Sequence, residues 1–126
     1  MEVMNLDNTP PFITMDGSEI RELLAHRNSA IRNQSLAEAR LPVGGATLEH
    51  YHRQTEEIYY ITHGTGRISI ERELRDVAVG DAIAIRPAQS TSFGTRAPAR
   101  CASSAAVRPA TNTATPLLPK RASPSA

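Results

Sequence analysis

The sequence predicts an all-β domain, built as a barrel or a sandwich. Short segments of alternating polarity follow one another between residues 29 and 85, and Gly-containing turns separate them at Gly44-Gly45, Gly64-Thr65-Gly66 and Gly80-Asp81. Short strands divided by such turns are typical of antiparallel β architectures. A chain of 126 residues has room for one domain with a single small core.

Residues 1–28 are predicted to form an extended segment followed by a short helix. A turn and an N-cap at Asp16-Gly17-Ser18 precede Ile20, Leu23 and Leu24, which would share one side of a helix. We expect this helix to end before Ser29 and to cover an open end of a sheet.

Residues 29–97 are predicted to form the barrel. Mixed polarity up to Leu41 leads into a turn over residues 42–45, and both features favour β structure over helix. The alternation of Ile68 and Ile70 with polar neighbours is the clearest strand pattern. The strands that we expect after the turn cover residues 47–52, 56–62, 67–71 and 82–85.

Residues 98–126 are predicted to be a disordered tail. They contain eight Ala and five Pro, no aromatic residue and no regular alternation of polarity. Such a composition offers too little apolar surface to offset the entropy of ordering the chain.

Charge and composition restrict the partners. All 13 acidic residues and eight arginines lie within residues 1–85, whereas residues 86–126 hold six basic residues and no acidic one. A basic tail can bind nucleic acid, but this one lacks aromatics and periodicity, so we expect no specific nucleic-acid partner. No long apolar stretch or signal pattern indicates a membrane, and the single Cys101 excludes an internal disulfide and fits a cytoplasmic location.

The residues with the clearest chemical meaning lie between Gly44 and Gly64, in the pattern Gly-x5-His-x-His-x4-Glu-x6-Gly. Its fixed polar positions are His50, His52 and Glu57. Residues i and i+2 of a strand point to the same face, so the two imidazoles would converge, with the carboxylate nearby. Two imidazoles and a carboxylate suit Zn, Fe, Mn or Ni. The competing interpretation is an exposed strand with a polar, solvated face.

This spacing between two glycines resembles the first signature motif of the cupin superfamily, over about residues 29–85. The resemblance implies a jelly-roll β-barrel that holds a divalent metal ion, here through His50, His52 and Glu57. Among cupins, the chain is similar to the small mannose-6-phosphate isomerase-like group, and many cupins form homodimers through edge strands. The family includes isomerases, dioxygenases, decarboxylases and modules that bind a small molecule without turnover.

The second cupin motif, Gly-x5-Pro-x-Gly-x2-His-x3-Asn, begins at Gly80 but is not completed. The positions of its Pro, Gly, His and Asn hold Arg86, Ala88, Thr91 and Thr95. The fourth metal ligand that the resemblance implies is therefore absent, and the barrel is expected to be incomplete on its C-terminal side.

A single lost base would explain this break. If residues 85–88 are encoded by ATC CGC CCG GCC, one C restored after ATC gives Ile-Pro-Pro-Gly. The codons permitted for residues 89–95 then allow x-Val-His-Lys-Leu-Trp-Asn, which completes the motif, and residues 100–107 allow an apolar strand. We therefore hypothesise that the chain is frameshifted after Ile85.

Three functional interpretations stay open at this point. The first is a metal-dependent isomerase or oxygenase acting on a small polar molecule, and the second is a non-enzymatic cupin that binds a small ligand. The third is an inactive frameshifted product. No residue stands out as a general base, so the sequence assigns no catalytic residue and leaves open whether the protein is an enzyme. Tyr59 and Tyr60 follow the motif on alternate faces, so one is expected inside the barrel and one outside.

Overall fold

The computed structural model describes residues 1–15, 17–42, 44–95, 99–104 and 118–119, with the backbone alone for the last two ranges. These residues form an all-β structure with one 3-10 turn, η1 (Leu6–Asn8), which confirms the predicted fold class. The strands are β1 (Phe12–Ile13), β2 (Glu19–Leu24), β3 (Leu36–Leu41), β4 (His50–Tyr51), β5 (Glu57–His63), β6 (Thr65–Ile70), β7 (Glu73–Ala78), β8 (Ala82–Ile85), β9 (Thr91–Gly94), β10 (Ala99–Ser104) and β11 (Leu118–Pro119). None of the helical residues in these ranges belongs to a segment long and apolar enough to cross a membrane.

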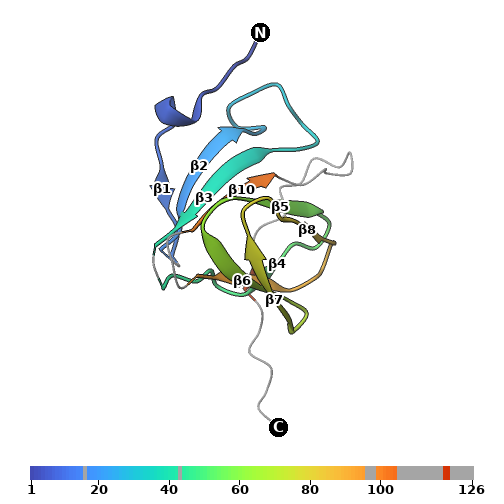
Figure 1. Cartoon of the computed structure of the whole chain (residues 1–126). Coiled ribbons are helices and arrows are strands. Elements are labelled where there is room, and N and C mark those ends of the chain that lie inside the picture. Colours follow the sequence, from blue (N-terminus) through green and yellow to red (C-terminus); the bar gives the residue numbers. More distant parts are fainter. Residues whose placement is uncertain (16, 43, 96–98, 105–117, 120–126) are drawn as a thin grey trace.

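The strands form two antiparallel sheets. Sheet A has the order β1-β2-β3-β10-β5-β8, and sheet B has the order β11-β4-β9-β6-β7. Strands β1, β2 and β3 extend to one side of the barrel that the other strands outline (Figure 1). Neither sheet closes on itself among the described residues, which agrees with the prediction of an incomplete barrel.

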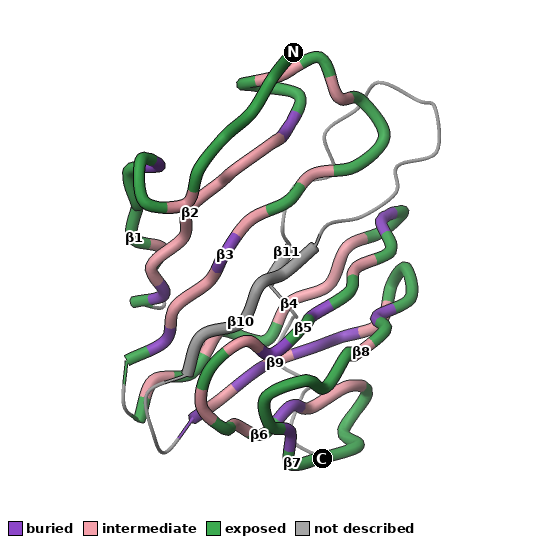
Figure 2. The backbone as a smooth tube through the Cα atoms, turned by 45° about the horizontal axis from the view of Figure 1, so that its top comes forward, coloured by how far each residue is buried: buried purple, intermediate pink, exposed green. Residues whose placement is uncertain are grey.

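The core lies between the inner faces of the two sheets. Its buried members come from β3, β5, β6, β7, β8 and β9, which carry purple segments in Figure 2. Alternation along each strand turns every second side chain inward, so β5 contributes Tyr59 and Ile61 while Ile58 and Tyr60 stay exposed. The core cluster consists of Leu41, Tyr59, Ile61, Ile68, Val77, Ile85 and Phe93.

The prediction of a short N-terminal helix is wrong. Residues Glu19–Leu24 form strand β2, which pairs with β1 on one side and with β3 on the other. Gly17, at φ +84°, lies in the tight turn between β1 and β2, where the Thr14 N–H donates to the Ser18 carbonyl oxygen at 2.9 Å. Pairing with β3 satisfies the backbone of β2 on a sheet, so tertiary context overrides the helical spacing of the apolar residues.

The prediction of a disordered segment from residue 98 is wrong for Ala99–Ser104. These residues form β10, which pairs with β3 along one edge and with β5 along the other. The two neighbouring strands offer unpaired backbone groups that β10 satisfies, and backbone pairing does not require large side chains. The other tail residues, 105–117 and 120–126, lie outside the described part of the chain.

Candidate metal centre

Two strands, one from each sheet, bring the predicted ligands together. His50 lies on β4 of sheet B, His52 follows that strand directly, and Glu57 is the first residue of β5 in sheet A. The short connection over residues 53–56 therefore crosses from one sheet to the other at the end of the barrel. A backbone hydrogen bond holds the start of this connection in place: the Ala88 N–H donates to the His52 carbonyl oxygen at 2.6 Å.

The three side chains form a compact, half-buried group. One ligand atom from each of His50, His52 and Glu57 lies within 4.8 Å of the others. The two imidazole rings meet edge to face, with centroids 5.6 Å apart and planes at 87°, and His52 Nε2 lies 3.6 Å from Glu57 Oε2. Ligands around a tetrahedral ion with bonds of about 2.1 Å lie about 3.4 Å apart, so the His52–Glu57 spacing suits such an ion and the trio as a whole is slightly open.

A hydrogen bond orients the first imidazole. His50 Nδ1 lies 2.8 Å from the Leu48 carbonyl oxygen, which can only accept, so Nδ1 carries the proton. This leaves the lone pair of Nε2 available to a metal ion. A backbone carbonyl on the far nitrogen of a ligating histidine is a common supporting contact in metal sites.

Burial shifts the pKa values of His52 and Glu57 in the directions that favour their neutral forms. Desolvation, with a smaller repulsion from His50, lowers the pKa of His52 to about 4. Desolvation raises the pKa of Glu57 to about 7. Near neutral pH His52 is therefore uncharged, and the 3.6 Å approach of His52 to Glu57 is not an ion pair.

The buried carboxylate therefore lacks both a counter-charge and a donor. Glu57 Oε2 is shielded from solvent and has no hydrogen-bond partner. An unpaired buried acceptor is costly, and a bound cation would supply the missing partner while the neutral imidazoles supply lone pairs. The donor set and its environment thus fit a divalent metal ion.

The second motif's histidine position lies beside this group. Thr91 of β9 is the register partner of His50 of β4, so the two side chains share a face. Thr91 is only 1% exposed, and its hydroxyl has no hydrogen-bond partner. The position where the cupin resemblance places a fourth ligand is thus next to the first ligand, but it holds a side chain that is a poor metal ligand.

The backbone explains the glycines of both motifs. Gly44, Gly64 and Gly80 have φ values of +72°, +75° and +93°, in the region that L-residues with a Cβ rarely adopt. Ala88, which replaces the other glycine of the second motif, has φ +64°. This position therefore keeps a conformation that favours glycine although the chain has an alanine there.

A hollow of about 720 Å³ opens between β6–β7 of sheet B and β8 of sheet A. Its lining combines apolar residues such as Ile70 and Ile83 with charged residues of both signs, namely Glu73, Arg75, Asp76, Asp81 and Arg86. Ile70 is the register partner of Thr91, which in turn pairs with His50, so the hollow lies two strands from His50, and none of the three candidate ligands lines it. This volume lies in the range of small-molecule sites.

Other sequence expectations can be compared with this geometry. Tyr59 is buried and Tyr60 is 48% exposed, which confirms that one packs inside and one outside. The contacts that orient the candidate ligands could not be predicted from the sequence, because the carbonyls of Leu48 and His52 act through the backbone and any residue type could supply them.

Comparison with known proteins agrees with the fold. The family model "Cupin domain" matches residues 37–102, more than half of the chain. The chain is 49% identical over 81 residues to an uncharacterized protein, MJ1618, of Methanocaldococcus jannaschii, and this match covers 64% of the chain and 65% of that protein.

Two solved structures are similar in fold. The structure of the polyketide cyclase RemF of Streptomyces resistomycificus superposes on this chain with a TM-score of 0.78 at 20% identity. The match covers 98% of this chain and 88% of RemF. A predicted oxalate decarboxylase of Thermotoga maritima has a TM-score of 0.74 at 21% identity, covering 84% and 99%. On the match to the family model, with the two sheets and the His-x-His group in agreement, this chain belongs to the cupin domain family.

Proposed function

We propose that this protein is a cupin that holds a divalent metal ion through His50, His52 and Glu57 and acts on a small polar molecule, as an isomerase or an oxygenase. The observation that carries the proposal is the buried Glu57 Oε2, which has no hydrogen-bond partner and faces His52 Nε2 at 3.6 Å. Zn, Fe, Mn and Ni all accept this set of ligands.

When bound, the metal ion would supply a Lewis acid that polarises an oxygen of the substrate. The chain's own residues would orient the ligands and admit the substrate. The Leu48 carbonyl holds the His50 ring, and the hollow beside Ile70 offers apolar surface together with charged side chains of both signs. Such a site favours a molecule that is small and bears at least one polar end.

A non-enzymatic binding module is the second candidate. Apart from the trio, the core cluster among the described residues is apolar, and Glu38, a buried acidic residue, is paired with Arg40 rather than free to act as a general base. A cupin of this kind would hold its ligand without turnover. The two candidates are separated by whether the metal-loaded protein consumes a substrate or only binds it.

The frameshift after Ile85 remains a hypothesis, and two observations support it. Ala88 has a positive φ where the restored frame reads Gly, and Thr91 lies opposite His50 where the restored frame reads His. Sequencing the gene across codon 86 tests the hypothesis, and an unbroken reading in related genes would refute it.

We propose that the protein acts in the cytoplasm, resembles the mannose-6-phosphate isomerase-like group in its chemistry and forms a homodimer through strand edges. Sedimentation of the purified chain at several concentrations would test the dimer.

The metal assignment is tested by metal content after loading and gel filtration. We expect the His50→Ala, His52→Ala double variant to retain about tenfold less metal than the unmodified chain, because each ligand carries a large share of the affinity. Equal metal content in the two proteins would refute the assignment.

A gain-of-ligand variant provides the complementary test. Thr91→His should increase metal affinity by about tenfold, since residue 91 lies opposite His50 on the same face. Ser92→His is the matched control, because the side chain of the next residue on β9 points to the opposite face. An equal gain in both variants would show that surface histidines bind the metal.

A further inference from the structure

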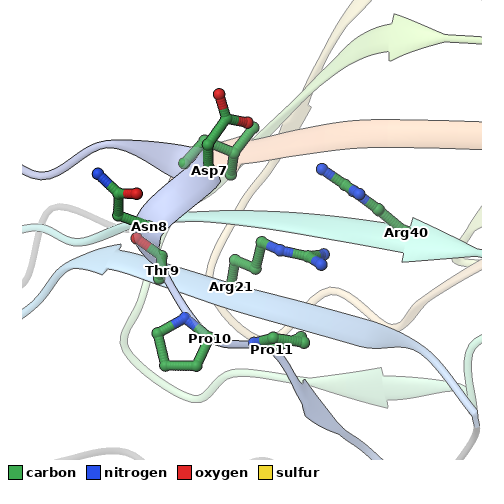
Figure 3. A pocket seen from close by; sticks show the side chains of 8 residues that line it. Asp7, Asn8, Thr9, Pro10, Pro11, Arg21 and Arg40 are labelled. Carbon is green, nitrogen blue, oxygen red and sulfur yellow. The ribbon is translucent and has the colours of Figure 1, made fainter.

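A second hollow lies on the outer face of sheet A, away from the metal centre. It has a volume of about 550 Å³ and lies between the N-terminal segment, residues 6–11, and strands β2 and β3 (Figure 3). Arg21 of β2 and Arg40 of β3 form its floor, and Pro10 and Pro11 form part of its wall. The metal ligands do not contribute to its lining.

The floor carries a square of alternating charges. Arg21 is the register partner of Glu38, and Arg40 is the register partner of Glu19, so the two arginines occupy one diagonal. The ion pairs run along each strand, from Arg21 Nη2 to Glu19 Oε1 at 2.7 Å and from Arg40 Nε to Glu38. Each carboxylate thus engages one part of one guanidinium group and leaves other donors of that group without a carboxylate.

One of these remaining donors is buried. Arg21 Nη1 is shielded from solvent and has no hydrogen-bond partner, and the Arg21 side chain as a whole is 14% exposed. The Arg40 side chain is 26% exposed, and it points toward the same space as Arg21 in Figure 3. Asp7 also belongs to the lining and brings one acidic side chain to the hollow.

A buried cationic donor without an acceptor is costly, and the hollow has room for a molecule that would supply one. Guanidinium groups bind planar carboxylates and phosphoryl groups through paired hydrogen bonds, which are among the stronger polar contacts in proteins.

We propose that this hollow binds a small oxyanion, a carboxylate or a phosphoryl group, between Arg21 and Arg40. The anion would accept hydrogen bonds from the terminal nitrogens of Arg40 and, after a turn of the Arg21 guanidinium group toward the hollow, from Arg21 Nη1. The residues 6–11 would close over it, since they form the opposite wall of the hollow. The site is separate from the metal centre and does not depend on the proposed function.

Calorimetric titration of the full chain with inorganic phosphate and, separately, with succinate tests the proposal. We expect one-site binding of at least one anion, with saturation by phosphate alone indicating a phosphoryl site and saturation by succinate alone indicating a carboxylate site. Arg21→Gln should weaken binding by about tenfold or more. Arg21→Lys should also weaken it, because an ammonium group keeps the charge but lacks the planar pair of donors.

Three further proteins make the outcome decisive. Arg27→Gln is the matched control, since Arg27 pairs with Glu22 on an exposed part of the surface, and it should bind as the unmodified chain does. The His50→Ala, His52→Ala variant should also bind normally, which separates this site from the metal centre. Arg40→Gln provides a second loss of a donor if Arg21→Gln does not fold. Absence of binding by both anions, or binding unaffected by both the Arg21→Gln and Arg40→Gln changes, would overturn the proposal.

Discussion

Replacing Glu57 by glutamine should stabilise the metal-free protein at high pH while removing a metal ligand. The pKa of Glu57 is raised from 4.5 to about 7, because its carboxylate is desolvated. A group with a raised folded-state pKa contributes stability that is complete below the unfolded-state pKa and is lost as the pH rises through the folded-state pKa. The ionised carboxylate therefore destabilises the fold above about pH 7, and the neutral amide of glutamine does not carry that cost.

The size of the effect follows from the shift. At about 1.4 kcal/mol per pKa unit, a shift of this size corresponds to an upper limit of about 3 kcal/mol, and we expect about 1–3 kcal/mol after relaxation around the side chain. The Glu57 side chain is 15% exposed, so solvent screens it only weakly. The gain should vanish near pH 4.5, where the carboxyl group is protonated in the folded protein.

Urea unfolding in the presence of a chelator measures this difference. The free energies of unfolding of the unmodified chain and of Glu57→Gln are compared at about pH 4.5 and at about pH 8. Because both proteins retain His52, its own titration contributes equally to both to a first approximation. With saturating metal the order should reverse, since only the unmodified chain keeps the full ligand set. A difference that is the same at both pH values would refute the argument from burial.

Three other predictions follow from single positions. Ala88→Gly should stabilise the fold by about 0.5–1 kcal/mol, because residue 88 has φ +64°. The control, Ala84→Gly on the exposed side of β8, should destabilise the fold by a similar amount. Urea unfolding midpoints measure both changes, and equal effects would contradict the backbone argument. Gly66→Ala should lower the free energy of unfolding by about 1–3 kcal/mol, because the new Cβ would lie 2.3 Å from Cζ of the buried Phe93; an unchanged thermal midpoint would show that the ring can move aside. Metal affinity should fall by about tenfold per pH unit below about pH 7, since the metal ion competes with the proton on Glu57; affinity that stays constant from about pH 5 to about pH 8 would exclude Glu57 as a ligand.

The proximity of His50, His52 and Glu57 could be predicted from the sequence, whereas their role as metal ligands stays a prediction. His50 and His52 are two residues apart in an extended segment, so their side chains lie close together because of the two-residue period of a strand and not because of the whole fold. The tight turns at Gly44 and Gly64 were equally predictable, since positive φ values favour glycine. The position of Thr91 beside His50 followed only from the family resemblance, because no local rule pairs β4 with β9.

The errors arose where long-range pairing determines the structure. Ile20, Leu23 and Leu24 have a helical spacing, but the backbone of β2 pairs with β1 and β3, and every residue of β2 is half-buried. The hollow around Arg21 and Arg40 could not be predicted from the sequence either, because the register of β2 and β3 brings the two residues together. Neither register nor strand order can be read from local propensity.

The central place of β10 in sheet A has a consequence for folding. The strand joins β1-β2-β3 to β5-β8, so the two parts of the sheet have no shared hydrogen-bonded ladder until a segment from the last third of the sequence arrives. Until β10 has been synthesised, β3 and β5 would each have an unpaired edge, and such an edge can pair with strands of other chains. Assembly that depends on such distant pairing is slow. Chaperone demand and misassembly of this protein should therefore depend more on how quickly β10 inserts than on the strength of the core.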